Sequence, residues 1–477
     1  MQTLTRRNFL KSSLLTTGAL SLSASSWRNV LGANEAVRVA VVGFRGRGAG
    51  HISELGRIPD ARIVALCDVD TLVLDAAAKR FQDRGVSVQT HVDVRQLLED
   101  KTIDAITTAT PNHWHSLISI WACQAGKDVY VEKPVSHNVW EGRKVVEAAR
   151  KYNRIVQSGT QSRSNAGLRE ALDWVRAGNL GKIEIARGLC YKPRGSIGKV
   201  DGPQPIPASI NYDLWCGPAP NGPLMRKNLH YDWHWVWPTG NGDIGNQGIH
   251  QMDVCRWALG KPELSPKIIS VGGRLGYVDD GETPNTQFAV HDYGDALLIF
   301  EVRGLPSAKG KKEMDKYRGL SIGHVIECEG GYLAGTTAFD KDGNQIRSFK
   351  TKGEENHMEN FIKAVRSRKS SDLNADILEG HLSSALCHTS NISYRLGAQA
   401  NPDAIRDAIR SDRDALETFG RMEEHLAANG VDLKKTKASL GMFLKMDGKA
   451  ERFINNPAAD GLLKDNYRAP YVVPEKV

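Results

Sequence analysis

A glycine-rich turn followed by an acidic residue is the first group in this 477-residue chain whose types and spacing suit ligand binding. Gly43, Gly46 and Gly48 lie in the segment GFRGRGAG, and Asp68 ends the next apolar run. Glycines let backbone N–H groups approach a pyrophosphate at a helix start, where the helix dipole favours negative charge. A carboxylate at the following strand end can accept hydrogen bonds from both ribose hydroxyls. The spacing departs from the usual GxGxxG, but with a strand, a helix and a strand around it the group predicts a dinucleotide site.

The charges near this turn bear on which dinucleotide it binds. Asp68 would repel a 2′-phosphate, and no arginine follows it closely, so the sequence favours NAD over NADP. Arg45 and Arg47 lie within the turn itself. Because an arginine can accommodate a 2′-phosphate, NADP remains the less favoured alternative.

Three later segments carry polar side chains directly after a predicted strand, where the ligands of an open α/β sheet bind. These segments are Thr110-Pro111-Asn112-His113-Trp114-His115, Glu132-Lys133-Pro134 and Gly159-Thr160-Gln161. We expect five of their residues to help bind the dinucleotide, namely Thr110, Asn112, His115, Glu132 and Gln161.

Residues 229–237, LHYDWHWVW, combine tryptophans and histidines between stretches rich in Pro and Gly. Aromatic faces pack on the apolar face of a sugar ring and imidazoles bind hydroxyls, so Trp233 and His234 are candidate substrate-binding residues. The alternation of Trp at 233, 235 and 237 fits a half-buried strand equally well. Tyr191, at a predicted strand end, is a further substrate candidate. The histidines have no carboxylate at a spacing that matches a metal site, so no metal is expected.

The order of several motifs carries a family resemblance. ATPNHWH and VYVEKP follow the glycine-rich turn, and GNGDIGNQGIHQMDVCRWALG comes later in the chain. From Val37 to about Gly397 the chain resembles the Gfo/Idh/MocA family, the relatives of glucose–fructose oxidoreductase and inositol dehydrogenase. The resemblance implies a Rossmann domain followed by an α+β domain with a large, open, mostly antiparallel sheet. It also implies a homodimer or homotetramer, since the exposed face of that sheet is the usual oligomer surface of the family.

The resemblance also implies catalytic residues. Lys133 matches the lysine of the family's EKP motif, beside the nicotinamide and the reacting hydroxyl, where a buried lysine can relay a proton. His250 matches the catalytic histidine. Many relatives carry an aspartate four residues earlier, where this chain has Asn246, which can orient a partner but cannot take up a proton. Either Lys133 and His250 share the base role, or the reaction is not a simple dehydrogenation. Asp253 is a candidate to bind substrate or orient a neighbour, or is a helix-surface acid.

The elements that position these residues follow from the hydrophobic pattern. VRVAVVG, ARIVALCD, VSVQTH, IDAITTATP, KDVYVEKP and RIVQSGTQ predict strands that alternate with helices, as in a doubly wound parallel sheet. After Gln161, KIEIARGLCY, KIISVGGRLG, DALLIFEVRG and HVIECEG predict strands without a helix between each pair. We expect a Rossmann domain over 34–160, an α+β substrate and oligomerisation domain over 161–400, and a helical extension with a C-terminal edge segment over 401–477.

The first 33 residues predict an export signal. A basic start, a short uncharged stretch and a small-residue exit are typical of a secretory signal, and Arg6–Arg7 before Phe9–Leu10 resembles a twin-arginine (Tat) signal. The apolar part is too short and too rich in Ser and Thr to span a bilayer stably. We therefore expect a periplasmic or otherwise exported protein with no stable membrane anchor.

Composition excludes several classes of protein. Hydrophobic residues make up 40% of the chain and charged residues 25%, which is ordinary for a globular protein. Half of the formal charge of +8 lies in the first 33 residues, and no basic run interleaved with aromatic residues remains, so no nucleic-acid partner is expected. The seven cysteines are widely spaced and predict free, buried thiols.

Three hypotheses of function follow. The first is an exported NAD(P)-dependent oxidoreductase that moves hydride between a CH–OH carbon of a sugar or polyol and a tightly bound nicotinamide. The second is an NAD-dependent glycoside hydrolase that uses transient oxidation and elimination, which would suit a compartment with little free NAD. The third is a non-catalytic ligand-binding protein on a Rossmann scaffold. The partner in the first two is a small sugar or glycoside.

Overall fold

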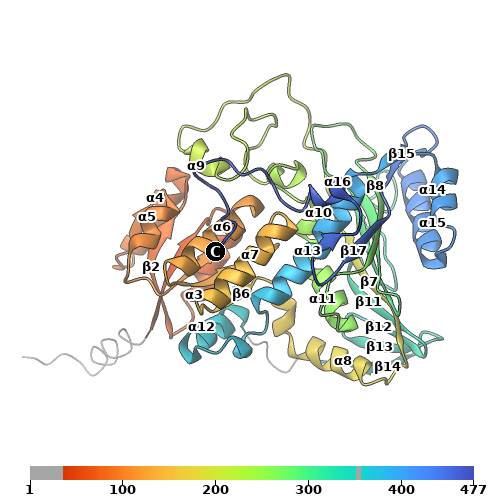
Figure 1. Ribbon diagram of the computed structural model, residues 1–477, viewed down its shortest axis with the longest axis horizontal. Helices are drawn as coiled ribbons and strands as arrows, with labels where there is room; N and C mark the ends of the chain where they lie inside the picture. The colour runs from red at the N-terminus through yellow and green to blue at the C-terminus, as the bar shows by residue number, and fades with distance from the viewer. Residues whose placement is uncertain (1–35, 351–355) are drawn as a thin grey trace, which may run out of the picture.

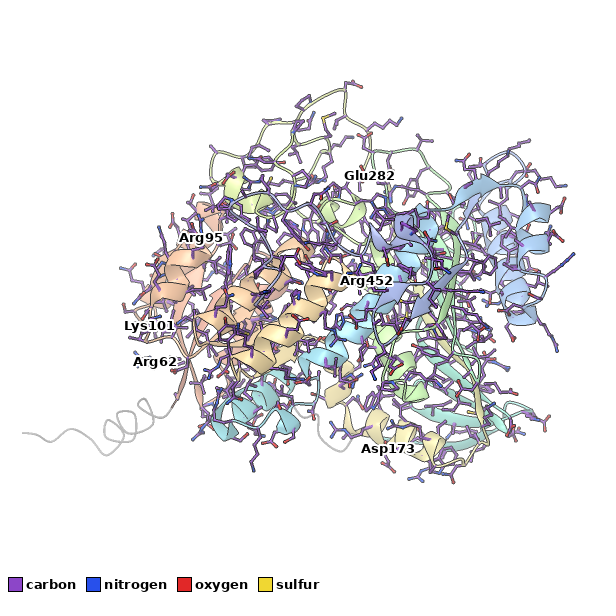
Figure 2. All side chains as sticks on the ribbon, viewed as in Figure 1. Arg62, Arg95, Lys101, Asp173, Glu282 and Arg452 are labelled. Atoms are coloured by element: carbon purple, nitrogen blue, oxygen red, sulfur yellow. The ribbon has the colours of Figure 1, made fainter. Side chains whose placement is uncertain are left out.

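The computed structural model describes residues 36–350 and 356–477, so the predicted export signal lies outside the described residues. Two sheets lie side by side, the first formed by the N-terminal part of the chain (Figure 1). Side chains occupy the space between the elements throughout (Figure 2). Over the described ranges, no helix has the length and apolar character needed to cross a membrane.

The first sheet has six parallel strands in the order β3-β2-β1-β4-β5-β6, the strand order of a dinucleotide-binding Rossmann fold. Its strands are β1 (Val37–Val42), β2 (Ala61–Cys67), β3 (Gln89–His91), β4 (Ala105–Thr108), β5 (Asp128–Val131) and β6 (Val156–Ser158). Its connecting helices are α3 (Arg47–Leu55), α4 (Thr71–Gln82), α5 (Val94–Glu99), α6 (Asn112–Gln124) and α7 (Val139–Lys151). The order reverses between β1 and β4, so the loops after these strands diverge and leave a crevice for a ligand.

The second sheet has twelve strands, and every pair in it is antiparallel except β7 with β10. Its strands are β7 (Ile183–Tyr191), β8 (Lys267–Gly273), β9 (Thr286–Asp292), β10 (Leu297–Arg303), β11 (Ile322–Cys328), β12 (Gly331–Ala334), β13 (Thr337–Asp340), β14 (Gln345–Ser348), β15 (Ala398–Ala400), β16 (Ala438–Leu440), β17 (Leu444–Asp447) and β18 (Arg452–Phe453). The predicted fold class, a Rossmann domain followed by an α+β domain with a large mostly antiparallel sheet, is confirmed.

Helices cover one face of this second sheet. They are α8 (Ala166–Arg176), α11 (Gly248–Leu259) and α13 (Ile377–Arg395), and their apolar side chains share one core with alternate residues of β7, β10 and β11. Helix α12 (His357–Ser367) instead packs on the first sheet through Met358, Phe361 and Ile362. The seven cysteines are buried free thiols, as predicted.

The opposite face of the second sheet is covered by the chain itself. The predicted helix pair is present as α14 (Pro402–Ala408) and α15 (Arg413–Ala428), beside the sheet at its outer side (Figure 1). Phe419 and Ile405 join one apolar cluster with Val271 and Phe288 of the sheet. The face that the family resemblance implies to be open is therefore closed here over β8, β9 and β10.

The last residues return to the first sheet. Residues 466–477, expected as an extended edge segment, form no strand. Tyr471, Val473 and Val477 are buried instead in the apolar cluster beside α6, and the Tyr471 ring lies edge-on to Trp114 at 5.5 Å. Because the side chains of this segment pack against a helix, its backbone does not run along the edge of a sheet and forms no strand pairing.

Candidate active site

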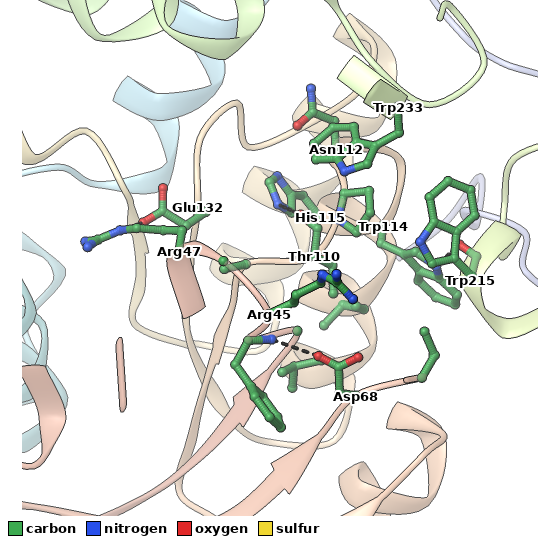
Figure 3. Close-up of a pocket in the computed structure, with 18 of the residues that line it drawn as sticks. Arg45, Arg47, Asp68, Thr110, Asn112, Trp114, His115, Glu132, Trp215 and Trp233 are labelled. Atoms are coloured by element: carbon green, nitrogen blue, oxygen red, sulfur yellow. Dashed lines mark hydrogen bonds and ion pairs between the residues drawn. The ribbon is translucent and has the colours of Figure 1, made fainter. Parts of the chain in front are cut away.

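One cavity of about 810 Å³ lies at the carboxyl ends of the first sheet and reaches α10 (Gly242–Asn246) and the start of α11 (Figure 3). Fourteen of the predicted site residues line it: Gly43, Arg45, Gly46, Asp68, Thr110, Asn112, His115, Glu132, Lys133, Gln161, Trp233, His234, Asn246 and His250. Gly48, Tyr191 and Asp253 do not line it. The structure therefore brings nearly all of the candidates from distant parts of the chain around one space.

The three glycines of the turn differ in what a side chain at each position would meet. Gly43 has φ +70°, and a Cβ there would lie 2.7 Å from Cγ2 of Thr110. A Cβ on Gly48 would lie 2.1 Å from the carbonyl oxygen of Gly43, so Gly48 serves the close packing of α3 on the turn. Nothing lies within 4 Å of a Cβ built on Gly46, which lines the cavity just before α3. A pyrophosphate fits this cradle, because the first amides of a helix have no partner within it.

Asp68 lies at the end of β2, where the sequence predicts it. Its Oδ2 accepts a hydrogen bond from the backbone N–H of Phe44 at 2.9 Å (Figure 3), and its Oδ1 accepts one from the backbone N–H of Asp70 at 3.0 Å. Burial raises the pKa of Asp68, and these two hydrogen bonds oppose that change. The residue thus ties the glycine turn to β2 and keeps acceptor lone pairs for ribose hydroxyls. Arg45 pairs with Asp70 at 3.3 Å and is largely exposed.

Glu132 joins three elements at the end of β5. Its Oε1 accepts hydrogen bonds from Nε of Arg47 at 2.9 Å and Nε2 of Gln161 at 3.3 Å, and lies 3.1 Å from Nε2 of His51. Burial alone would raise the pKa of Glu132, but the His51 contact and the charges of Lys133 and Arg47 hold it well below its usual value. This carboxylate is therefore ionised, and it fixes α3 against the end of β5.

Asn112 and His115 hold neighbouring loops in place. The His115 ring lies between two carbonyl oxygens, 2.6 Å from Nδ1 to Pro134 and 2.8 Å from Nε2 to Thr110. Nδ2 of Asn112 donates to Oδ1 of Asn241 at 2.9 Å, in the loop before α10. These contacts link the ends of β4 and β5 to the second half of the molecule. Both residues line the cavity while their polar atoms contact protein groups.

Lys133 and His250 line the cavity from opposite domains. Nζ of Lys133 donates a hydrogen bond to the backbone carbonyl of Asn246 at 2.7 Å. Burial lowers the pKa of Lys133, although the charges of Glu132 and Asp243 oppose this. Burial and the nearby Lys133 charge lower the pKa of His250 to about 3. The imidazole is therefore neutral at neutral pH and can accept a hydrogen bond, but it is too weak a base to hold a proton there.

The aromatic segment is a turn and not a strand, so the alternative of a half-buried strand is wrong. Residues Asp232–Trp235 form a 3₁₀ helix, η2, which starts after Tyr231 at φ 66°. The rings of Trp233 and His234 stack with centroids 3.6 Å apart. Nδ1 of His234 lies 2.6 Å from the carbonyl oxygen of Tyr231, an acceptor, so Nδ1 carries the proton. Burial lowers the pKa of His234 to about 3, which leaves Nε2 as a neutral acceptor.

Two substrate candidates lie elsewhere. The buried hydroxyl of Tyr191 donates to Glu301 at 2.7 Å, on the face of the second sheet that α15 covers. Asp253 is fully buried and bound by Arg163 at 2.8 Å and by the Ser383 hydroxyl at 2.7 Å. Neither side chain is available to a ligand in the cavity, because each is saturated by its protein partners.

Part of the cavity wall is formed by residues that were not predicted from the sequence. Trp114, Leu214, Trp215, His230 and Tyr231 also line the cavity. Trp215 belongs to the short helix α9 (Tyr212–Cys216) in the long connection after β7, and the indole N–H of Trp114 donates to its carbonyl oxygen at 3.1 Å. Trp114 and His230 stand in motifs already singled out, whereas Leu214 and Trp215 have no local signal. In the ranges that the structure describes, no group of three or more His, Cys, Asp or Glu residues could hold a metal ion.

A Rossmann sheet, a glycine cradle and a strand-end carboxylate, with a lysine and a histidine lining the same cavity, define a dinucleotide-binding site. Residues 37–160 match the model of the oxidoreductase family, NAD-binding Rossmann fold, and residues 182–291 match that of the oxidoreductase family, C-terminal alpha/beta domain. The chain belongs to the Gfo/Idh/MocA oxidoreductase family.

Several known proteins are similar to parts of the chain. Glycosyl hydrolase family 109 protein 2 of Shewanella sp. (strain ANA-3) is 32% identical over 166 residues, which are 30% of this chain and only 36% of that protein. Myo-inositol 2-dehydrogenase of Thermotoga maritima is 28% identical over 280 residues, 58% of this chain and 76% of that protein. The WlbA dehydrogenase of Bordetella pertussis, solved in complex with NADH and UDP-GlcNAcA, has a TM-score of 0.55 at 21% identity, covering 74% of this chain and 94% of that one. This structural likeness shows the shared fold.

Proposed function

We propose that this protein is an exported NAD-dependent oxidoreductase that acts on a CH–OH group of a sugar or polyol, with NADP as the less favoured cofactor. The observation that carries the proposal is the continuity of the cavity. Asp68 and the glycine turn line one part of it, and Lys133 and His250 line another. A dinucleotide with its ribose at Asp68 would extend toward these two residues, where the substrate carbon would lie.

The protein's part of the reaction is to place the substrate and move one proton. The bound nicotinamide would supply the hydride acceptor or donor. During oxidation, the uncharged amine of Lys133 takes the proton of the reacting hydroxyl, since burial favours its neutral form. The Asn246 carbonyl holds one N–H of this amine and so orients its lone pair. His250 and Nε2 of His234 are neutral acceptors for neighbouring hydroxyls.

The cavity walls support tight retention of the cofactor. Trp114 and Trp215 line the crevice (Figure 3), and Tyr471 from residues 466–477 packs edge-on to Trp114. A retained cofactor suits an exported enzyme, which we propose on the basis of the Tat-like signal in residues 1–33.

The first experiment is to purify the exported protein, denature it and identify released nucleotide by mass spectrometry. We expect about one NAD(H) per chain, and incubation with a panel of sugars and inositols should change its redox state. Protein that contains no nucleotide and binds no added NAD or NADP would refute the proposal and favour a non-catalytic ligand-binding role. Fractionation of cells that express the full chain, compared with an Arg6→Lys, Arg7→Lys variant, tests export.

The second candidate function is NAD-dependent glycoside cleavage through transient oxidation and elimination. Asn246 favours it, because this chain lacks the acid expected of a simple dehydrogenase, and the similar Shewanella protein is named as a glycosyl hydrolase. Release of free sugar from a glycoside with no net change in cofactor redox state would establish this reaction. Accumulation of a keto-sugar with one equivalent of reduced cofactor would establish the first.

A further inference from the structure

A second cavity, of about 500 Å³, lies between segments 193–198 and 227–235. Both segments belong to the long connection that follows β7, in the layer of irregular loops that also carries Glu282 (Figure 2). The backbone N–H of Glu282 donates to the carbonyl of Trp235 at 2.7 Å, which ties η2 to this layer. No residue proposed to handle the dinucleotide lines this second cavity.

The two cavities share one turn. Tyr231 lines both of them, and its side chain is 52% exposed. After Tyr231, residues Trp233 and His234 line the first cavity, whereas Asp232 and Trp235 line the second. A ligand bound beside His234 and extending past the Tyr231 ring would therefore enter the second cavity.

The second cavity has the chemistry of a site for a hydroxylated ring. The Arg194 guanidinium packs on the Trp235 ring at 5.2 Å, is neutralised by Asp243 at 2.7 Å and donates to the Tyr231 hydroxyl at 2.9 Å. Asp232 accepts from Nδ2 of Asn228 at 2.9 Å. The half-exposed Tyr231 ring, with these donors and acceptors beside it, is suited to the C–H face and the hydroxyls of a sugar.

Lys227 adds a further donor at this place. Its side chain lines the second cavity and lies against Gly198, where an added Cβ would be 2.8 Å from its Nζ. Across the described ranges, its ammonium forms no ion pair within 4.0 Å. The group is therefore available to a hydroxyl of a bound ligand.

We infer that the substrate carries a second sugar ring, which occupies this cavity while the ring to be oxidised lies beside Lys133 and His250. The inference rests on the proposed function and narrows its substrate class from free sugars and polyols to glycosides. It applies equally to oxidation of the glycoside and to cleavage of the bond between the two rings.

The test compares turnover of monosaccharides with that of the corresponding disaccharides, on protein carrying its cofactor. We expect kcat/KM to be higher for a disaccharide. In the variant Lys227→Ala/Asn228→Ala, the ratio of kcat/KM for the disaccharide to kcat/KM for the monosaccharide should fall about tenfold. This is the equivalent of two lost hydrogen bonds. Lys199→Ala removes an exposed lysine of the same connection that lines neither cavity, and should keep the ratio. Binding of the disaccharide, measured by calorimetry, gives a second readout.

Two negative results are distinguishable. Equal turnover of monosaccharides and disaccharides, with no effect of the double variant on the ratio or on calorimetric affinity, overturns the second-ring site and leaves the proposed function standing. Failure of every sugar and glycoside to change the cofactor or to be cleaved overturns the proposed function, and the inference with it.

Discussion

Lys133 lies in surroundings that disfavour its charged form while they keep it hydrogen-bonded. The side chain is half-buried, and its donor contact is to the neutral carbonyl of Asn246. The adjacent Glu132 is already neutralised by Arg47 and by its contact with His51, so its charge compensates Lys133 only in part. A lysine of this kind can cycle between amine and ammonium at accessible pH.

The pH dependence should follow from these groups. For sugar oxidation, kcat/KM should rise with pH as Lys133 loses its proton, and the rise should lie below the ordinary lysine value because burial lowers the pKa. Lys133→Arg stays charged, so it should lose about 10² to 10⁴ in rate and the rise should disappear. His250, with its pKa lowered to about 3, should add no transition near neutrality. A rise that persists in Lys133→Arg would exclude Lys133 as the base.

The departure at Asn246 gives a second test. Asn246→Asp places a carboxylate near Nζ of Lys133, which favours the ammonium form and should move the rise to higher pH by about one unit. Asn246→Ala is the matched control, since it retains the backbone carbonyl that accepts from Nζ and adds no charge. Stopped-flow pH profiles of the first turnover measure the shift. An unchanged profile in Asn246→Asp would show that a charge at position 246 does not affect the pKa of Lys133.

Most residues of the candidate site were predictable because their motifs follow strands. Asp68, Glu132 and Lys133 stand at strand ends, and an open parallel sheet collects strand ends at one edge. Tyr191 also ends a strand, but that strand belongs to the mostly antiparallel second sheet, and its hydroxyl contacts Glu301 on the face that α15 covers. Asp253 was not separable from a surface acid by spacing alone, since its partner Arg163 is ninety residues away.

At the scale of an element, the packing of α3 on its turn should depend on Gly48. In Gly48→Ala the new Cβ meets the Gly43 carbonyl, so we expect unfolding free energy to fall by about 1–3 kcal/mol and NAD affinity to weaken. In the control Gly50→Ala, on the same helix, the new Cβ meets only the end of the flexible Arg47 side chain, at 2.9 Å. Denaturant unfolding and NAD titration measure both effects. Equal losses in the two variants would contradict the steric argument.

Helices and strands were predicted correctly where one local sequence pattern determines them. The Rossmann strands are continuous apolar runs, and α15 has a clear helical period, so both are present as expected. Residues 232–235 alternate like a strand yet form η2, because their rings pack on each other and on loops. The strands β16 and β17 pair with β8, which lies much earlier in the chain. No local sequence pattern predicts a pairing between such distant segments.

For the whole molecule, the covered sheet face bears on assembly. The oligomer implied by the family resemblance would use the face that α14 and α15 occupy over β8, β9 and β10. The ion pair from Arg421 of α15 to Glu301 of β10 reinforces this cover, as does the hydrogen bond that Arg187 of β7 donates to the Thr418 hydroxyl of α15 at 2.8 Å. We propose that the chain forms a homodimer or homotetramer through a surface other than the covered face of β8, β9 and β10.

Retention of the cofactor should also depend on the whole molecule. Tyr471 is buried, packs on Trp114 and donates to Asp213 at 3.0 Å. Tyr471→Ala should lower the unfolding free energy by about 3 kcal/mol and speed the loss of bound NAD, because the wall beside the cavity loosens. Val472→Ala changes the exposed neighbour and is the control. Nucleotide content after repeated filtration measures retention, and equal loss from both variants would contradict this role.

The return of residues 466–477 to α6 has a consequence for biosynthesis. The first sheet is complete once β6 has been made, but Tyr471 and Val473, which pack beside it, follow every strand of the second sheet in the chain. Domains usually fold in order during translation, whereas this crevice gains its outer support only after synthesis of the second sheet. We expect nascent chains that lack these residues to capture NAD poorly, so that cofactor loading follows the synthesis of residues 466–477.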